Sequence, residues 1–321
     1  MSSSISIRER AFAPGENSLS IGIANIHAVV PGIERNKRKI LETMAVFKEK
    51  KVNMVVFPEF CLSGYFWENQ QECRDYMNSA VIERHHDWIT DMLFPMLDDD
   101  LNYIVFNNIR KGSSGHHRKY LNSTYILNRT VDYMKEDYIY DKIMLPGIEK
   151  IYTRSGLDDR LVIDTKWGRF GFTTCYDYCF SQLLQEYSKI DQIDAVVQVA
   201  SWKGTGTREY PTMNIHTDTY YGMLWDMLLS SRSATNQVWT IACNSVGVHT
   251  ISGTRFWGGS GLWAPSGINI VQASHFNEEL LIIHNIDIKG QRKIEVDDLE
   301  YTMDFNKIYR HLKGKRTFTR M

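Results

Sequence analysis

Residues 169–177 read RFGFTTCYD, and this stretch decides the fold. Its first half is short and apolar, as expected of a strand buried in a sheet, and a helical spacing of Leu183, Leu184 and Tyr187 follows it. Cys175 therefore stands where a strand gives way to a helix. There the positive end of a helix dipole favours the thiolate, the nucleophilic form of the side chain. A lone cysteine is more often an inert core residue, so this position needs support from elsewhere in the chain.

Two further segments place charged side chains at the ends of apolar runs. Residues 54–60 (MVVFPEF) lead directly into Glu59, and residues 138–149 (YIYDKIMLPGIE) set Lys142 among aromatic and aliphatic neighbours, ahead of Glu149. A buried charge is costly unless it is paired or lies in a cleft. Singly, Glu59 could cap a loop and Lys142 could lie on a solvated strand face. Together with Cys175, these residues indicate a thiol with acid–base partners.

The order Glu, Lys, Cys resembles the nitrilase superfamily of carbon–nitrogen hydrolases, whose members use a triad of these residues. The resemblance implies that Glu59, Lys142 and Cys175 are the triad and that Glu149 is a second glutamate kept near the reacting centre. It covers roughly residues 19–290. Further matching segments are 20–25 (SIGIAN), 199–202 (VASW), 232–236 (RSATN), 242–247 (ACNSVG), 256–260 (FWGGS) and 264–267 (APSG).

The hydrophobic pattern alternates between strands and helices, which predicts an α/β fold with a mixed sandwich. The resemblance sharpens this to a four-layer α-β-β-α sandwich that dimerises through its helices. We divide the chain into an N-terminal arm (1–18), a hydrolase domain (19–290) and a C-terminal tail (291–321) that packs on a partner subunit. The predicted helices are 34–50, 79–97, 179–188 and 220–236. The predicted strands are 20–26, 53–57, 102–108, 122–128, 132–139, 161–164, 168–173, 194–199, 238–243, 260–264, 268–272 and 280–287.

The resemblance implies a covalent mechanism, which divides amide cleavage into two easier steps. Cys175 attacks the carbonyl carbon to give a thioester, and Glu59 is the general base that takes the thiol proton and later activates water. Lys142 and the backbone N–H of Tyr176 stabilise the oxyanion. Glu149 holds Glu59, Lys142 or the leaving group in place. The expected reaction is hydrolysis of a small amide with release of ammonia or an amine.

The residues after the nucleophile bear on the substrate. Nitrilases proper usually have Trp-Glu there, whereas Tyr176 and Asp177 resemble the amidase and carbamoylase branches. Some carbamoyl-amino-acid hydrolases bind the substrate carboxylate through arginines just beyond; this chain has Tyr178 and Cys179. Arg208 could supply a carboxylate partner instead. An N-carbamoyl amide hydrolase and a nitrilase remain alternatives, and a non-catalytic binding protein of the same fold is a further one.

Aromatic residues near the triad segments are candidate substrate contacts. We predict this role for Tyr65, Trp67, Trp202 and Trp257, although ordinary core packing explains such residues equally well. Residues 203–219 contain glycines and no hydrophobic period, so we expect a mobile loop there.

Composition excludes several classes of function. Lys and Arg total 37 against 38 Asp and Glu, so no field of one sign points to nucleic acid or to an anionic membrane. The five cysteines (61, 73, 175, 179 and 243) are odd in number and lack zinc-ligand spacing, which fits a reduced, cytoplasmic chain. We expect no transmembrane span, no metal and no organic cofactor. The partners expected are the small-molecule amide and other copies of the chain, as a homodimer or larger homo-oligomer.

Overall fold

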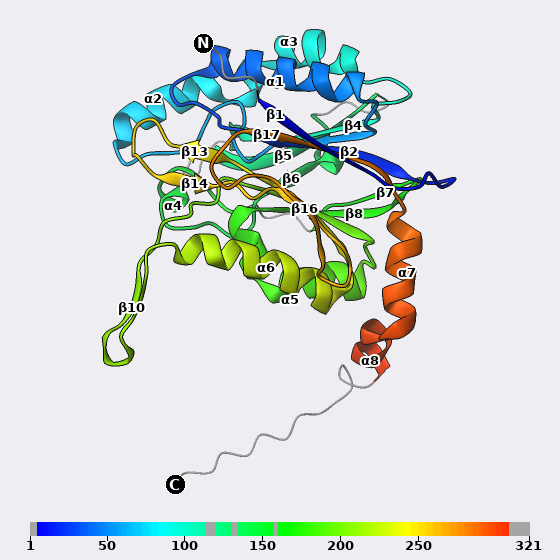
Figure 1. The fold of residues 1–321 in the computed structure, drawn as a ribbon. Helices are drawn as coiled ribbons and strands as arrows, with labels where there is room; N and C mark the ends of the chain where they lie inside the picture. Colours follow the sequence, from blue (N-terminus) through cyan, green and yellow to red (C-terminus); the bar gives the residue numbers. More distant parts are fainter. Residues whose placement is uncertain (1–4, 113–119, 130–133, 157–159, 308–321) are drawn as a thin grey trace.

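The computed structural model describes residues 5–112, 120–129, 134–156 and 160–307. Two β-sheets stack face to face, and helices cover both outer surfaces (Figure 1). The predicted four-layer α-β-β-α sandwich is therefore confirmed.

The first sheet has seven strands in the order β1-β17-β2-β3-β4-β5-β6. It mixes parallel pairs, such as β2 with β3, and antiparallel pairs, such as β4 with β5. The strands are β1 (Ser6–Ala11), β2 (Leu19–Asn25), β3 (Met54–Val56), β4 (Tyr103–Lys111), β5 (Tyr120–Asn128), β6 (Ile139–Asp141) and β17 (Glu279–Ile286).

The second sheet has six strands in the order β16-β15-β12-β9-β8-β7. Its centre is the parallel trio β8, β9 and β12. The strands are β7 (Val162–Thr165), β8 (Gly168–Thr174), β9 (Ala195–Ala200), β12 (Trp239–Asn244), β15 (Gly261–Trp263) and β16 (Asn269–Gln272). Two small hairpins lie outside both sheets: β10 (Arg208–Tyr210) with β11 (Ile215–Thr217), and β13 (Val246–Val248) with β14 (Arg255–Trp257).

Successive side chains of β2 point alternately into the space between the sheets and toward the outer helices. Ile21 and Ile23 point into the space between the sheets, where they share one apolar cluster with Phe172 of the second sheet. Gly22 points to the outer face, against Phe47 of α1 (Ile33–Glu49). A Cβ on Gly22 would lie 2.5 Å from the Phe47 ring, so only glycine allows the helix to approach this closely.

The helices confirm some predictions and correct others. Helix 34–50 is α1, in which Ile40, Met44 and Phe47 are buried, and helix 220–236 is α6 (Tyr220–Asn236). The continuous helix predicted over 79–97 is wrong, because α2 (Gln70–Ala80) ends at about the residue where the predicted helix begins. The 3-10 turn η1 (Ile82–Arg84) follows α2. An unbroken helical run comes next, made of α3 (His86–Trp88), the π-helical η2 (Ile89–Leu93) and the 3-10 segment η3 (Phe94–Met96).

Helix 179–188 begins two residues later than predicted, after the extended Phe180, and runs without a break from α5 (Ser181–Gln185) into the π-helical η6 (Glu186–Ile190). Residue 179 is the end of η5 (Cys175–Cys179). Strand 132–139 is wrong over residues 134–138, of which 136–138 form the 3-10 turn η4 (Glu136–Tyr138), and only Ile139 belongs to a strand, β6; residues 130–133 lie outside the described part. The N-terminal arm contains β1, which pairs in parallel with β17.

The C-terminal tail packs on its own chain as far as residue 307. The helices are α7 (Ile288–Asp298), whose Ile288 is buried in the core between the sheets, and α8 (Tyr301–Lys307). Gln237 Nε2 donates to the carbonyl oxygen of Glu295 at 2.8 Å, and Arg292 donates to Asp194 at 3.0 Å. Residues 291–307 therefore contact their own chain, packing of the tail on a partner subunit stays a prediction, and residues 308–321 lie outside the described part. None of the described helices combines the length and the apolar character that a membrane span requires.

Candidate active site

Cys175 occupies a sharp bend between β8 and the 3-10 turn η5. Its φ is 50°, in the left-handed region that residues with a side chain rarely adopt. Asp177 Oδ2 accepts a hydrogen bond from the Thr174 N–H at 3.0 Å, and the Thr174 side chain accepts one from the Asp177 N–H. Gln198 Nε2 donates to the Cys175 carbonyl oxygen at 3.0 Å. Such a conformation costs on the order of 1–3 kcal/mol, so these bonds are needed to hold it.

The prediction that a helix dipole favours the Cys175 thiolate is wrong. Only the five-residue turn η5 follows the thiol, and the side chain is buried. Burial raises the pKa of Cys175 well above its usual value, the Glu59 carboxylate raises it further, and Lys142 opposes them. The resting thiol is therefore protonated and needs a base beside it to become a nucleophile.

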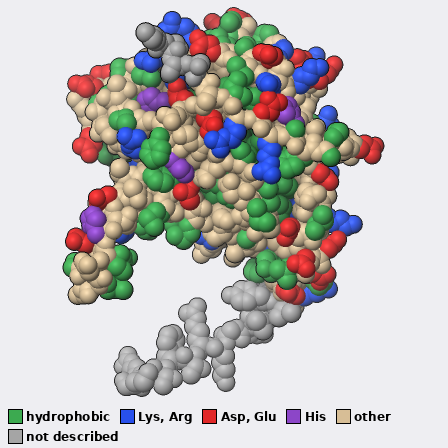
Figure 2. Space-filling view, viewed as in Figure 1, with side chains coloured by type: hydrophobic (Ala, Val, Ile, Leu, Met, Phe, Trp, Pro, Cys, Tyr) green, Lys and Arg blue, Asp and Glu red, His purple; other side chains and the backbone are tan. Residues whose placement is uncertain are grey.

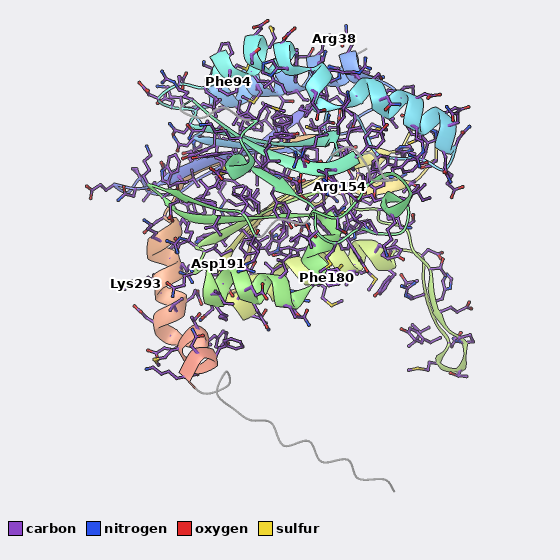
Figure 3. The ribbon with its side chains drawn as sticks, turned by 180° about the vertical axis from the view of Figure 1, so that it is seen from behind. Arg38, Phe94, Arg154, Phe180, Asp191 and Lys293 are labelled. Atoms are coloured by element: carbon purple, nitrogen blue, oxygen red, sulfur yellow. The ribbon has the colours of Figure 1, made fainter. Side chains whose placement is uncertain are left out.

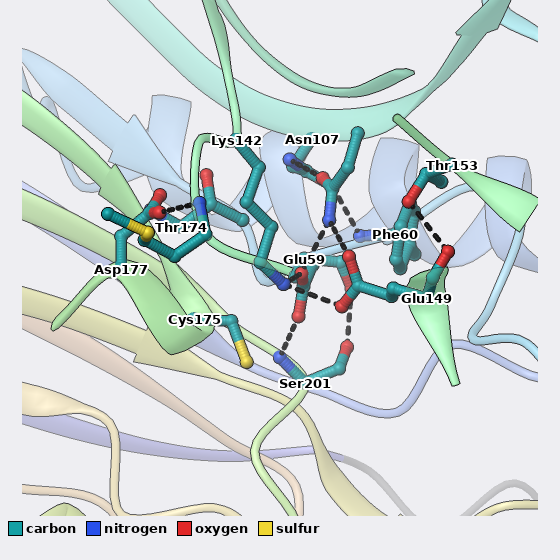
Figure 4. Close-up of polar contacts among 12 residues, drawn as sticks. Glu59, Phe60, Asn107, Lys142, Glu149, Thr153, Thr174, Cys175, Asp177 and Ser201 are labelled. Carbon is teal, nitrogen blue, oxygen red and sulfur yellow. Dashed lines mark hydrogen bonds and ion pairs between the residues drawn. The ribbon is translucent and has the colours of Figure 1, made fainter. Parts of the chain in front are cut away.

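Glu59 lies just beyond the end of β3 and is fully buried. Its Oε1 accepts hydrogen bonds from Lys142 Nζ at 2.8 Å and from Asn122 Nδ2 at 2.7 Å. Its Oε2 accepts from the Ser201 N–H at 2.7 Å, and Ser201 Oγ donates to the Glu59 carbonyl oxygen at 2.8 Å. These bonds orient the carboxylate, toward which the sulfur of Cys175 points (Figure 4).

Lys142 follows β6 and reaches both glutamates. Its Nζ also donates to Glu149 Oε1 at 2.6 Å. Glu149 Oε1 accepts from the Tyr65 hydroxyl at 2.8 Å, and Oε2 accepts from Asn122 Nδ2 at 3.0 Å. The side chains of Lys142, Glu59 and Glu149 are all 0% exposed. Glu149 therefore binds Lys142 directly, one of the roles predicted for it.

These groups shift one another's pKa. Burial acts to lower the pKa of Lys142, but the Cys175 sulfur when it is ionised, and the Glu149 and Glu59 carboxylates, raise this pKa well above its usual value, so the ammonium keeps its charge. Burial raises the pKa of Glu149, Lys142 opposes the change, and Glu59 adds to it. One cation is thus bonded to two carboxylates and lies close enough to the thiol to oppose the rise of its pKa.

Asp177 ties the bend at the nucleophile to the segment that carries Lys142. Its Oδ2 accepts from the Tyr140 hydroxyl at 2.8 Å, and its Oδ1 accepts from the Met144 N–H at 2.7 Å. Tyr140 and Met144 lie two positions before and after Lys142. Burial raises the pKa of Asp177 to about 6, while Lys142 acts to lower it.

Sequence reasoning missed three residues of this network: Asn107, Asn122 and Ser201. Asn122 bridges Glu59 and Glu149, and Asn107 Nδ2 donates to Asn122 Oδ1 at 2.8 Å. The signal that Asn107 and Asn122 leave in the sequence is an amide side chain within a strand that otherwise reads as apolar. Because a buried amide must be hydrogen-bonded, such a position points to a polar partner nearby.

The predicted aromatic contacts separate into two groups. Tyr65 reaches the site through its hydrogen bond to Glu149. Trp202 shares an apolar cluster with Cys175, and Trp257 packs against that cluster. Trp67 belongs to a different cluster, so the structure does not bring it to the thiol.

The position between the two carboxylates is taken by the chain's own cation, Lys142 Nζ. Within the described residues, no group of three or more His, Cys, Asp or Glu side chains is placed to hold a metal ion. The absence of a cofactor stays a prediction from the sequence.

Known proteins share this fold. The chain is 24% identical over 252 residues to the hydrolase in the agr operon of Staphylococcus lugdunensis, covering 77% of this chain and 94% of that protein. The carbon–nitrogen hydrolase from Helicobacter pylori G27 superposes with a TM-score of 0.71 at 16% identity, over 93% of this chain and 99% of that one.

An amidase from Nesterenkonia sp. AN1 superposes with a TM-score of 0.68 at 16% identity, over 90% of this chain and 98% of that one. That structure is a glutamate-to-glutamine mutant with the acetamide moiety of fluoroacetamide added covalently to its active-site cysteine. The chain also matches glutamine-dependent NAD+ synthetase from Acinetobacter baumannii (TM-score 0.61, 20% identity, 83% of this chain), but spans only 45% of that protein.

At these identities the solved structures establish the fold alone. The sequence model of the carbon–nitrogen hydrolase family matches residues 20–294, most of the chain. The protein therefore belongs to the carbon–nitrogen hydrolase family, within the nitrilase superfamily.

Proposed function

We propose that the protein hydrolyses a small amide through a thioester on Cys175 and releases ammonia or an amine. The observation that carries this proposal is the meeting of a buried thiol with Lys142, Glu59 and Glu149, the last three joined by bonds of 2.6 and 2.8 Å. An amide carbon is a weak electrophile and its nitrogen a poor leaving group. The reaction therefore needs a base for the thiol, a cation for the oxyanion and an acid for the leaving nitrogen.

Acylation begins when Glu59 takes the proton of the Cys175 thiol and the sulfur attacks the carbonyl carbon. The oxygen that becomes negative is stabilised by Lys142, with the N–H of Tyr176 as the second proposed donor. Collapse of this species breaks the C–N bond, and Glu59 returns its proton to the departing nitrogen. The products of this half-reaction are a thioester and ammonia or an amine.

Deacylation uses the same groups. Glu59 takes a proton from water, the hydroxide attacks the thioester, and Lys142 again faces the negative oxygen. The C–S bond breaks and the Cys175 sulfur recovers its proton. The sum of the two steps is amide plus water to carboxylic acid plus ammonia or amine.

The surroundings of the thiol support an uncharged amide. Tyr178, where carbamoyl-amino-acid hydrolases can carry an arginine, is buried, and its hydroxyl lies 2.7 Å from Thr240 Oγ1. Trp202 and Trp257 add an apolar wall near Cys175. A structural neighbour, a cysteine-to-alanine mutant of the Nesterenkonia amidase, binds butyramide, a small aliphatic amide.

The test combines turnover with identification of the intermediate. Ammonia release is measured on a panel of aliphatic amides, N-carbamoyl compounds and nitriles, and mass spectrometry of the enzyme during turnover locates any added mass. We expect amides to turn over and an acyl group to add to Cys175, with neither effect in Cys175→Ala. Turnover of nitriles alone, or of N-carbamoyl compounds alone, would replace the amidase proposal by the corresponding alternative.

We further propose a homo-oligomer formed through the outer helices, which a contrast between two helices of equal length supports. On α1 the exposed positions include Glu34, Arg35, Arg38 and Lys48, as expected of a helix in contact with water. On α6 the exposed positions Met223, Met227, Ser231 and Thr235 carry no charge.

A further inference from the structure

His249 is a buried histidine that the catalytic scheme does not use. It lies in the turn between β13 and β14 and is 1% exposed, whereas residues 250–253 of the same turn are exposed. Acidic and basic side chains of the described residues are interspersed over the face seen in Figure 2, so charge of one sign does not mark a ligand site there. A buried polar side chain, by contrast, must find hydrogen-bond partners inside the protein.

The two small hairpins differ in their place on the molecule. Figures 1 and 3, which view the molecule from opposite sides, both show β10–β11 projecting away from the body and β13–β14 lying at the end of the sandwich that carries α4 (Glu149–Tyr152). The expected mobile loop over 203–219 is thus a defined ribbon, formed by β10 and β11. The hairpin that carries His249 lies at the same end of the sandwich as Glu149, the first residue of α4.

The partners of His249 specify one neutral form of its ring. Its Nε2 lies 3.1 Å from the carbonyl oxygen of Tyr65, which can only accept a hydrogen bond, so Nε2 carries the proton. Its Nδ1 lies 3.0 Å from the main-chain nitrogen of Ser252, which can only donate, and 2.9 Å from Ser252 Oγ, so Nδ1 is the acceptor. Burial lowers the pKa of His249, which agrees with an uncharged ring.

Tyr65 connects His249 to the catalytic cluster. Its hydroxyl donates to Glu149 Oε1 at 2.8 Å, and the same oxygen accepts from Lys142 Nζ at 2.6 Å. Burial raises the pKa of Tyr65 well above its usual value, so the hydroxyl keeps its proton and remains a donor. A bond to the main chain of Tyr65 and a bond from its side chain therefore lead from His249 to the Lys142 ammonium.

Aromatic packing holds the ring of Tyr65 between these two bonds. The centroid of the buried Phe256 ring lies 6.1 Å from that of Tyr65 and 6.1 Å from that of His249, both edge to face. The Phe60 ring packs edge to face on Tyr65 as well, at 5.6 Å. Aromatic pairs prefer this geometry. Because the ring is packed on both neighbours, the position of its hydroxyl follows that of the Tyr65 main chain.

We propose that His249 is a positioning residue for the reaction at Cys175. Its bond to the main chain of Tyr65 sets the Tyr65 hydroxyl against Glu149, and Glu149 in turn fixes Lys142 for the oxyanion. This role rests on the function proposed above. A donor must be aimed at the oxyanion before the charge develops, since reorganisation during the reaction costs free energy. Loss of His249 therefore lowers kcat and leaves KM nearly unchanged.

The test is a double-mutant cycle between His249 and Tyr65. His249→Ala removes the bond to the main chain, Tyr65→Phe removes only the hydroxyl, and a third variant carries both. We expect each single substitution to lower kcat about tenfold, and the double variant to lose about tenfold rather than about a hundredfold, because His249 acts through that hydroxyl. His249→Gln, whose amide can donate to the same carbonyl oxygen, should recover most of kcat. His85→Ala is the matched control, since His85 is also buried and its Nε2 lies 3.0 Å from the Ser79 carbonyl oxygen.

The rate at which iodoacetamide alkylates Cys175 gives the same comparison without a substrate, because Lys142 acts to lower the pKa of that thiol. We expect slower alkylation in both single variants and no further slowing in the double variant. His249→Leu, which fills similar volume without hydrogen bonds, replaces the alanine variant in the cycle if that variant does not fold.

Losses that add in the double variant, a raised KM with normal kcat, or an equal loss in His85→Ala would each overturn the role of His249. A wild type that hydrolyses no amide contradicts the proposed function alone, since the alkylation cycle still tests the connection from His249 to Cys175.

Discussion

Cys175 and Cys243 are two buried thiols of the same sheet with opposite surroundings. Cys243 lies within β12, and its Sγ is 3.2 Å from the Ala24 carbonyl oxygen and 3.3 Å from that of Val56. Burial raises the pKa of both thiols well above the usual value. Burial therefore does not distinguish a nucleophile from a core residue.

The difference lies in the backbone and in the charged neighbours. Cys243 continues an extended strand, whereas Cys175 adopts a left-handed φ of 50° at the end of its strand. Cys175 then faces Glu59 and Lys142, and Cys243 faces main-chain carbonyl groups. A thiol with a raised pKa reacts only where a base can take its proton at the moment of attack. The predictions below test this difference.

Cys175→Ala has the largest expected effect on activity. Removal of the nucleophile should lower kcat by about 10⁴-fold or more, because the thioester can no longer form. Ammonia release from an amide substrate measures it, with thermal unfolding as the control for the fold. Retention of more than about a tenth of wild-type activity would contradict the assignment.

Lys142→Ala should lower kcat by about 10²–10³-fold with little change in KM, since an oxyanion donor acts mainly in the transition state. The substitution also leaves Glu59 and Glu149 buried without their cation, which destabilises the protein. Lys142→Ala combined with Glu149→Gln is the matched control for this destabilisation, because the double variant leaves only one buried carboxylate, that of Glu59, without a cation. A raised KM with normal kcat in both variants refutes the oxyanion role.

Asp177→Asn should lower kcat roughly tenfold or more, through loss of hydrogen bonds to a charged acceptor near Lys142. In the wild type, protonation of Asp177, whose pKa is about 6, should lower kcat as the pH falls through that value. Because burial raises this pKa in the folded state, the pH dependence of the stability that Asp177 contributes is opposite in sign to that of kcat. This contribution increases as the pH falls from about 6 toward the unfolded value of about 4.

The measurement for Asp177 is kcat and the unfolding midpoint, each against pH, for wild type and variant. We expect the acid limb of kcat to weaken in Asp177→Asn, and the wild type to gain stability relative to the variant as the pH falls through the window between those two pKa values. Superimposable pH profiles for the two proteins exclude Asp177 as the titrating group.

Cys243→Ala has the smallest expected effect. It removes one buried sulfur from a packed strand, so we expect a loss of about 1 kcal/mol in unfolding free energy and activity within about twofold of wild type. Denaturant unfolding and the ammonia assay measure the two quantities. A collapse of activity without loss of stability would show that thiols outside the Glu59 site take part in the chemistry.

The elements with a strong hydrophobic period could be predicted from the sequence. β2 and α1 follow such a period, and the central strands of the second sheet are continuous apolar runs. The resemblance to the nitrilase superfamily, and not the period, predicted that Glu59, Lys142 and Cys175 act together. α2 could not be predicted, because only Cys73, Met77 and Ala80 of its eleven residues are buried and most others are polar. Helix 79–97 failed as one helix because the chain leaves the helical conformation at Val81 and again at His85.

The details of the site were less predictable than its members. The spacing of Asn107, Asn122 and Ser201 along the chain gives no sign that they surround Glu59, since they come from segments brought together only by tertiary structure. The state of the thiol was also misjudged. A helix after Cys175 predicted a thiolate, whereas burial of the side chain and the adjacent Glu59 carboxylate keep the proton on sulfur.

The most direct test of the account is alkylation of the two thiols by iodoacetamide near neutral pH, followed peptide by peptide with mass spectrometry in the wild type and in Glu59→Gln. The account predicts rapid modification of Cys175 in the wild type and no comparable modification of Cys243. It predicts that Glu59→Gln slows the reaction of Cys175 by about 10²-fold, because the base for its proton is gone. An unchanged rate at Cys175 in Glu59→Gln, or equal rates at Cys175 and Cys243 in the wild type, would contradict it.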